Sequence, residues 1–236
     1  MLNRTAVIHQ PDFIPYLGFF HRLLYADLFI ILDSVQYVRG SRSWTSRDKI
    51  KTAGGIHWLS IPVRKCARAT PISEVIIADE LPWQEGHLNI LRESYRKAAG
   101  FAEVWPHIEH FYCGKYQRLI EATTASINLL LELLAIRVPC VLASTLQPQG
   151  QKSELLAGLL EVAGIGHYLS GVGARAYLDM APFRKRGIAV RYQEFHHPVY
   201  PQMHGAFVAN LSALDLLLNC GINSARRIVR EDLKVP

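Results

Sequence analysis

The stretch TAVIHQPDFIPYLGFFHRLLYADLFIIL, residues 5–32, decides the fold. It opens with an apolar run from Thr5 to Ile8 that is typical of a short strand, and apolar residues then recur at helical spacing from Ile14 to Tyr25. The run from Leu28 to Leu32 is wholly apolar, as in strands that are buried on both faces of a parallel sheet. The stretch therefore predicts an opening β-α-β unit.

The same alternation returns in the last third of the chain. A buried strand is expected at 138–143, a helix from Lys152 to Ala163, and further strands at 167–170 and 188–195. Strands that alternate with helices indicate a parallel α/β sheet with right-handed crossovers. We therefore predict one α/β domain over residues 1–236, with a parallel, Rossmann-like sheet and flanking helices.

The middle of the chain has a different pattern. A β-rich excursion is predicted at about 36–80, with the strand-like segments HWLSIPV and EVIIAD. A helical segment follows at about 83–135, and Pro82 and Pro106 are expected to mark the starts of separate helices.

Composition limits the classes of function. The 236 residues are half apolar and carry a net charge of +6, but no apolar run is long enough for a membrane span. The start of the chain lacks the features of a signal peptide, which favours a cytoplasmic protein. Four scattered cysteines argue against a disulfide framework. Short basic groups make an anionic ligand plausible.

Three polar residues follow the first two predicted strands. Ligands of parallel α/β sheets bind beside the carboxyl ends of the strands. His9 and Gln10 follow the first strand and Asp33 follows the second, so we predict that these three are catalytic. The alternative is structural, with Asp33 capping a turn and His9 bonded to a loop carbonyl.

Further substrate-binding candidates come from four other segments. The polar and aromatic run after the second strand offers stacking and basic groups, and a lysine that opens a helix can hold a phosphate. A glycine-rich loop follows the predicted strand at 167–170 but lacks the remainder of a dinucleotide motif, so a plain tight turn is its alternative. A proline-stiffened loop lies near the end. The candidates are Gln36, Tyr37, Trp44, Arg47, Lys152, Ser153, Ser170, Arg175, Tyr177, His197, Tyr200 and Gln202.

Several unusual strings together resemble one family. They cover nearly the whole chain in order: HQPDFIPYLGFF, ADLFIILDSVQYVR, SWTSRDKI, HWLSIPV, YLSGVGARAYLD, HHPVYPQMHGAF and LSALDLLLNCG. The sequence is similar to the WbqC-like family. That resemblance implies a bacterial protein whose relatives belong to gene clusters for O-antigen, other surface glycans and, less often, natural products.

The order of motifs is also similar to that of pantothenate synthetases, which are ATP-using ligases of the nucleotidyltransferase superfamily. The match lies in the histidine loop, the lysine of KSELL and the loop SGVGARAYL. This resemblance implies a nucleotidyltransferase-type sheet that binds ATP with Mg²⁺. The H-x-G-H motif departs from the pattern, because Pro11 replaces its glycine and its second histidine is missing; Gln10 could supply the missing donor.

We therefore expect a transferase or ATP-dependent ligase that binds a nucleotide or nucleotide-sugar and transfers an acyl or aminoacyl group in glycan or natural-product biosynthesis. One rival is a non-catalytic module that binds nucleic acid or another ligand. For nucleic acid, Tyr37 and Trp44 would stack on bases and Arg39, Arg42 and Arg47 would contact phosphates. A second rival is a metal-dependent hydrolase that uses His197 and His204, although no metal site is predicted.

Overall fold

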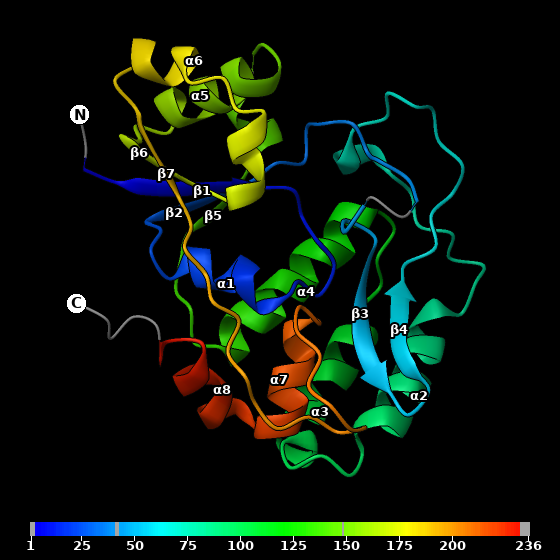
Figure 1. Cartoon of the computed structure of the whole chain (residues 1–236). Coiled ribbons are helices and arrows are strands. Elements are labelled where there is room, and N and C mark those ends of the chain that lie inside the picture. The colour runs from blue at the N-terminus through cyan, green and yellow to red at the C-terminus, as the bar shows by residue number, and fades with distance from the viewer. Residues whose placement is uncertain (1–2, 41–42, 148, 232–236) are drawn as a thin grey trace. The chain divides into compact units, whose positions relative to one another are not determined.

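The computed structural model describes residues 3–40, 43–147 and 149–231 (Figure 1). Its contacts divide the chain into two compact units, which we call the sheet unit and the helical unit. The prediction of one domain with an insertion stays a prediction. The sheet unit consists of Met1–Gln10, His21–Val35 and Arg137–Phe195, and the helical unit consists of Pro11–Phe20, Gln36–Ile136 and His196–Pro236.

The sheet unit contains a five-stranded parallel sheet, which confirms the predicted α/β fold. The strand order is β5-β2-β1-β6-β7. The chain thus builds outward from β1 to β2 and β5, and then crosses to the other side of β1 to add β6 and β7. The strands are β1 (Thr5–His9), β2 (Leu28–Ile31), β5 (Cys140–Leu142), β6 (His167–Ser170) and β7 (Ala189–Tyr192).

Helices cover both faces of this sheet. Helices α5 (Lys152–Val162) and α6 (Ala181–Lys185) lie on one face, and the last turn of α1 (Leu17–Leu23) lies on the other (Figure 1). The core on the α5 face includes Ile8 and Phe183, which are at most 4% exposed. Two short 3-10 helices, η2 (Ala143–Leu146) and η3 (Val172–Ala176), follow β5 and β6.

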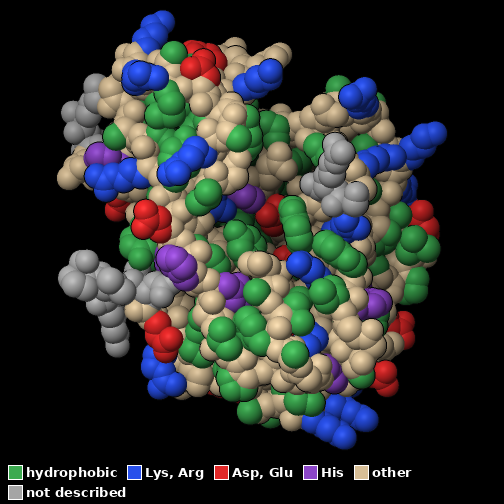
Figure 2. Space-filling view, in the orientation of Figure 1, with side chains coloured by type: hydrophobic (Ala, Val, Ile, Leu, Met, Phe, Trp, Pro, Cys, Tyr) green, Lys and Arg blue, Asp and Glu red, His purple; other side chains and the backbone are tan. Residues whose placement is uncertain are grey.

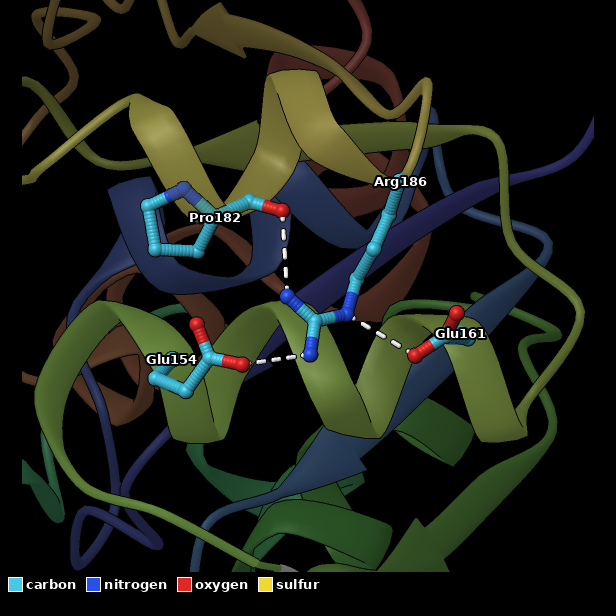
Figure 3. Close-up of polar contacts among 4 residues, drawn as sticks. All are labelled: Glu154, Glu161, Pro182 and Arg186. Carbon is cyan, nitrogen blue, oxygen red and sulfur yellow. Dashed lines mark hydrogen bonds and ion pairs between the residues drawn. The ribbon is translucent and has the colours of Figure 1, made fainter.

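An arginine cross-links the two helices on the α5 face. Arg186 follows α6, and its Nε donates to Oε2 of Glu161 at 2.8 Å while its Nη2 donates to Glu154 (Figure 3). Its Nη1 donates to the carbonyl of Pro182 at 3.2 Å. Both glutamates belong to α5, so one guanidinium fixes α6 against two successive parts of that helix.

The helical unit consists of helices and an antiparallel hairpin. Among the described residues, no helix is long and apolar enough to cross a membrane. The elements are β3 (Arg47–Thr52), β4 (Gly55–Ser60), η1 (Ile72–Glu74), α2 (Trp83–Tyr95), α3 (Phe101–Tyr112), α4 (Leu119–Leu133), α7 (Ala213–Cys220) and α8 (Ile222–Ile228).

A buried carboxylate organises the helical unit. Asp215 of α7 is fully buried, and Tyr95 donates to its Oδ1 at 2.7 Å. Tyr200 and Gln202 donate to its Oδ2 at 3.0 and 2.8 Å. Lys51, also buried, donates to the carbonyls of Gly205 and Ala206. These bonds attach the loop that contains HHPVYPQMHGAF to α2, α7 and the hairpin.

Two predicted element boundaries at the start of the chain and in the helical segment were wrong. The first helix starts at Leu17 instead of Ile14, because Ile14 has a φ of 40° and donates its backbone N–H to the Ser126 hydroxyl. Pro106 lies inside α3 instead of at its start. Helix α3 instead starts directly after Gly100, so the position of a proline does not indicate where this helix begins.

Two predicted strands also differ from the structure. The segment EVIIAD alternates between buried and exposed residues, yet it forms only the isolated bridges of Ile76 with Arg118 and Ile77 with Val63. The alternation arises because Val75 and Ile77 are buried in the core. The segment has no continuous partner strand among the described residues, so it is not a strand of a sheet. Strand β5 was expected to be buried but is a partly exposed edge strand of three residues.

Gly100 is required where α3 meets α7. A Cβ at this position would lie 2.4 Å from the backbone nitrogen of Gly221 and 2.4 Å from the carbonyl oxygen of Leu217. Since both contacts are backbone atoms, Gly100→Ala is expected to lower the free energy of unfolding by about 2–3 kcal/mol in urea denaturation. Gly86→Ala is the control, because no atom beyond its chain neighbours and the backbone of its own helix lies within 4 Å of its Cβ position, and alanine favours the helix by roughly 0.5–1 kcal/mol. Equal effects of both changes would contradict the packing argument.

Candidate functional site

The sheet changes its direction of growth between β1 and β6, and the ends of these two strands form the candidate site. Thr5 pairs with His167 and Ala6 with Tyr168, so the register carried forward sets His9 level with Gly171. In open α/β sheets, ligands bind in the crevice at such a switch point, outside the carboxyl ends of the strands. His9 and the glycine loop therefore share the edge at which open α/β sheets in general bind their ligands.

His9 holds a neutral imidazole with a defined tautomer. Its Nδ1 lies 2.9 Å from the carbonyl oxygen of Gln10, which can only accept, so Nδ1 carries the proton and Nε2 carries the lone pair. Burial, and next the positive charge of Arg22, lower the pKa of His9 from 6.5 to about 3. At neutral pH the ring can therefore accept a proton at Nε2 but bears no positive charge.

Arg22, near the end of α1, is the second main residue of the site. Its side chain is only 3% exposed, which is rare for an arginine. A Cβ placed on Gly171 would lie 3.1 Å from Nη1 of Arg22, so the guanidinium packs against the glycine backbone at the end of β6. Sequence reasoning missed Arg22. The available signal was its position among Leu17, Phe20 and Leu23, because a helix with apolar residues on every side is buried.

At the same edge of the sheet, the Asp33 carboxylate is hydrogen-bonded to Ser144. The side chain is fully buried, and both of its oxygens accept hydrogen bonds from Ser144. The backbone nitrogen of Ser144 lies 2.9 Å from Oδ1, and its hydroxyl lies 2.6 Å from Oδ2. Asp33 thus caps η2 and joins the ends of β2 and β5, which is the structural alternative considered for it.

A pocket of about 350 Å³ opens on the α1 face of the sheet. Its lining includes His21 and Tyr25 from α1 and the residues after it, and Arg191, Gln193 and Glu194 from the end of β7. Nε2 of Gln193 donates to Nδ1 of His21 at 3.1 Å, and both side chains are buried. These two residues form a fixed inner wall of the pocket.

Comparison with known proteins agrees with this arrangement of motifs. Residues 10–227 match the WbqC-like protein family. The chain belongs to this family. It is also 30% identical over 222 residues to the uncharacterized protein Rv1507c of Mycobacterium tuberculosis (strain ATCC 25618 / H37Rv), an alignment that covers 93% of this chain and 95% of that protein. No solved structure matches the chain significantly.

The other predicted substrate-binding residues in the sheet unit of this WbqC-like protein differ in how far they are buried. Ser170 is buried at the end of β6, beside Gly171. Ser153 is also buried, and its hydroxyl accepts from the backbone nitrogen of Asp179 at 2.9 Å. Lys152 starts α5 and is exposed, Tyr177 is 77% exposed, and the guanidinium of Arg175 lies 4.8 Å from the ring centre of Tyr192. The ligand-binding roles of these residues stay predictions.

In the helical unit, the polar and aromatic run divides into buried and exposed residues. Tyr37 is 6% exposed and donates to the Ser46 hydroxyl, whereas Gln36 is exposed. Trp44 is 41% exposed and pairs with Trp58 of the hairpin, with 5.3 Å between ring centres. The guanidinium of Arg47 lies 4.2 Å from the ring centre of Trp58. Figure 2 shows hydrophobic and basic side chains together over this hairpin. The nucleic-acid rival thus retains Trp44 and Arg47 but has a buried Tyr37, and Arg42 lies outside the described residues.

In this WbqC-like protein, the histidines of the loop that contains HHPVYPQMHGAF form hydrogen bonds within the helical unit. Nδ1 of His197 lies 2.8 Å from the carbonyl of Pro198, and Nε2 of His204 lies 2.8 Å from the carbonyl of Ser94. In the part of the chain that the structure describes, no group of three or more histidine, cysteine or acidic side chains is arranged to hold a metal ion. Tyr200 and Gln202 donate to Asp215, as described above.

Proposed function

We propose that this protein is a transferase that binds a nucleotide or nucleotide-sugar at the switch point and transfers an acyl or aminoacyl group. The observation that carries the proposal is the position of Arg22, a buried arginine packed against Gly171 beside His9. A guanidinium offers several N–H donors in a planar fork that suits phosphate oxygens. Membership of the WbqC-like family supports surface-glycan or natural-product biosynthesis as the setting.

In this proposal the two residues have separate roles. Arg22 holds the phosphates, and the glycine at position 171 lets them approach the backbone closely. The amine or hydroxyl of the acceptor gives its proton to Nε2 of His9 while its nitrogen or oxygen forms a bond to the acyl carbon. The bond between that carbon and its leaving group breaks, and the leaving group takes the electron pair. A phosphate bound nearby offsets the charge of Arg22 and raises the pKa of His9 towards a useful value for a base.

The identity of the nucleotide is part of the proposal. ATP with Mg²⁺ would activate an acyl group by adenylation, whereas a nucleotide-sugar would serve as the acceptor. The chain supplies the same anion-binding arginine in both cases. A binding panel should therefore contain ATP with and without Mg²⁺, as well as uridine, thymidine, guanosine and cytidine diphosphate sugars.

Isothermal titration of the full chain tests the proposal. At least one member of the panel should bind, and Arg22→Gln should weaken that binding by about ten- to a hundredfold, since a charged hydrogen bond contributes roughly 1.5–3 kcal/mol. Arg22→Lys keeps the charge without the planar fork and should lose less affinity. Circular dichroism should show that the variants remain folded.

Arg137→Gln is the matched control. It removes the same charge from an exposed residue ahead of β5, at the opposite end of the strands. The control should bind as the natural protein does in the same buffer. The proposal is wrong if nothing in the panel binds, or if Arg22→Gln and Arg137→Gln weaken binding equally.

A further inference from the structure

The pocket on the α1 face has a size that suits part of a nucleotide. Its volume of about 350 Å³ is at the small end of the range for ligand sites, roughly 300–1,000 Å³. The described lining residues belong to one unit of the molecule and come from α1, β1, β6 and β7 and from the segments next to them. A nucleoside fits this volume better than a complete nucleotide-sugar does.

The pocket adjoins the proposed phosphate site through two residues. His21 lines the pocket and is followed directly by Arg22. Gln193 lines it as well, and its backbone nitrogen donates to the carbonyl of Ser170 at 2.8 Å, next to Gly171. One end of the pocket therefore lies next to the proposed phosphate site, whereas Thr5 and His167, at the starts of β1 and β6, line its other end.

The lining has the groups that recognise a nucleoside. Tyr25 is 46% exposed and offers a ring on which a planar base can stack. The ring of His21 supports it, with 5.2 Å between ring centres. Glu194 is an exposed carboxylate that can accept hydrogen bonds from a ribose diol or from the N–H groups of a base, and Arg191 is an exposed donor.

We propose that the pocket between α1 and strands β6 and β7 binds the nucleoside of the nucleotide whose phosphates bind Arg22. This inference rests on the proposed function and adds the place and the chemistry of base recognition to it. Tyr25 stacks on the base, Glu194 accepts from the nucleoside, and the bonded pair of His21 and Gln193 forms the rigid inner wall. The α1 face of the sheet thus selects the nucleotide, while the switch point binds the phosphates.

Titrations with nucleoside diphosphates and inorganic pyrophosphate separate the two parts of the site. The panel is ADP, GDP, CDP, UDP and dTDP. At least one should bind about tenfold or more tightly than pyrophosphate, because base stacking contributes roughly 1–3 kcal/mol. Tyr25→Ala should remove that advantage and leave the affinity for pyrophosphate unchanged. Tyr25→Phe is the matched control, since it keeps the ring and should keep the advantage.

The outcomes distinguish this inference from the proposed function. Equal affinity for pyrophosphate and every nucleoside diphosphate would overturn the nucleoside pocket while leaving the phosphate site in place. So would an unchanged preference in Tyr25→Ala, for which the half-exposed position makes misfolding easy to exclude by thermal denaturation. If neither pyrophosphate nor any nucleoside diphosphate binds, the proposed function fails and the pocket assignment fails with it.

Discussion

Replacement of Asp215 by alanine is expected to lower the free energy of unfolding by about 3–5 kcal/mol. The carboxylate is fully buried and accepts from Tyr95, Tyr200 and Gln202 at 2.7 to 3.0 Å. Alanine would leave these three donors without their acceptor in a site that excludes water. Urea denaturation, monitored by tryptophan fluorescence, measures the loss directly.

Two further variants separate the contribution of the carboxylate from that of its partners. Tyr200→Phe removes a single donor and should cost about 1 kcal/mol. Asp215→Asn keeps the shape and one accepting oxygen, so its cost should lie between those of the other two variants. Burial raises the pKa of Asp215 and the three donors oppose this, so the ranking should be measured at neutral pH, where the side chain of a free aspartate is ionised. The buried-acceptor argument fails if Asp215→Ala costs no more than Tyr200→Phe.

The opening β-α-β unit was predictable because its apolar patterns are strong. The run Leu28 to Leu32 contains β2, an interior strand of the sheet, and β6 occupies residues 167–170 as predicted. The ends of elements depend on local geometry that an apolar pattern does not contain. Ile14 adopts a left-handed φ, and the close approach of backbones at Gly100 sets the start of α3.

The candidate site was predictable only in part, and for a related reason. His9 follows a recognisable strand, so the rule for strand ends found it. Arg22 lies within a helix and follows no strand, so that rule could not select it. Tyr200 and Gln202 were predicted to bind substrate, and the structure adds a contact that the sequence did not indicate, because both side chains donate to Asp215. A buried acid within the leucine-rich sequence ALDLLLN was the available signal for that network.

The ring of His9 is expected to stay neutral throughout the pH range in which an ordinary histidine titrates. Its pKa of about 3, compared with 6.5, corresponds to at most roughly 5 kcal/mol of difference between the two protonation states. Heteronuclear NMR of the imidazole should therefore show no titration of His9 between pH 5 and 8, with the proton on Nδ1. Since the charge of Arg22 is the second cause of the shift, Arg22→Gln should raise the pKa of His9.

His87 is the control for that experiment, because burial is the first cause of its lowered pKa of about 4 and Arg22 is not among the causes. Its titration should be the same in the natural protein and in Arg22→Gln.

The lowered pKa of His9 also sets how the stability of the folded protein depends on pH. The unfolded chain binds a proton at His9 below pH 6.5, whereas the folded chain binds it only below about pH 3. The contribution of His9 to the free energy of unfolding is therefore complete above pH 6.5 and declines as the pH falls. His9→Asn should remove up to about 1.4 kcal/mol per pH unit from that slope. A His9 ring that titrates near pH 6.5 would contradict the effect of its burial, and a His9 pKa that Arg22→Gln leaves unchanged would mean that Arg22 and His9 do not form one electrostatic site.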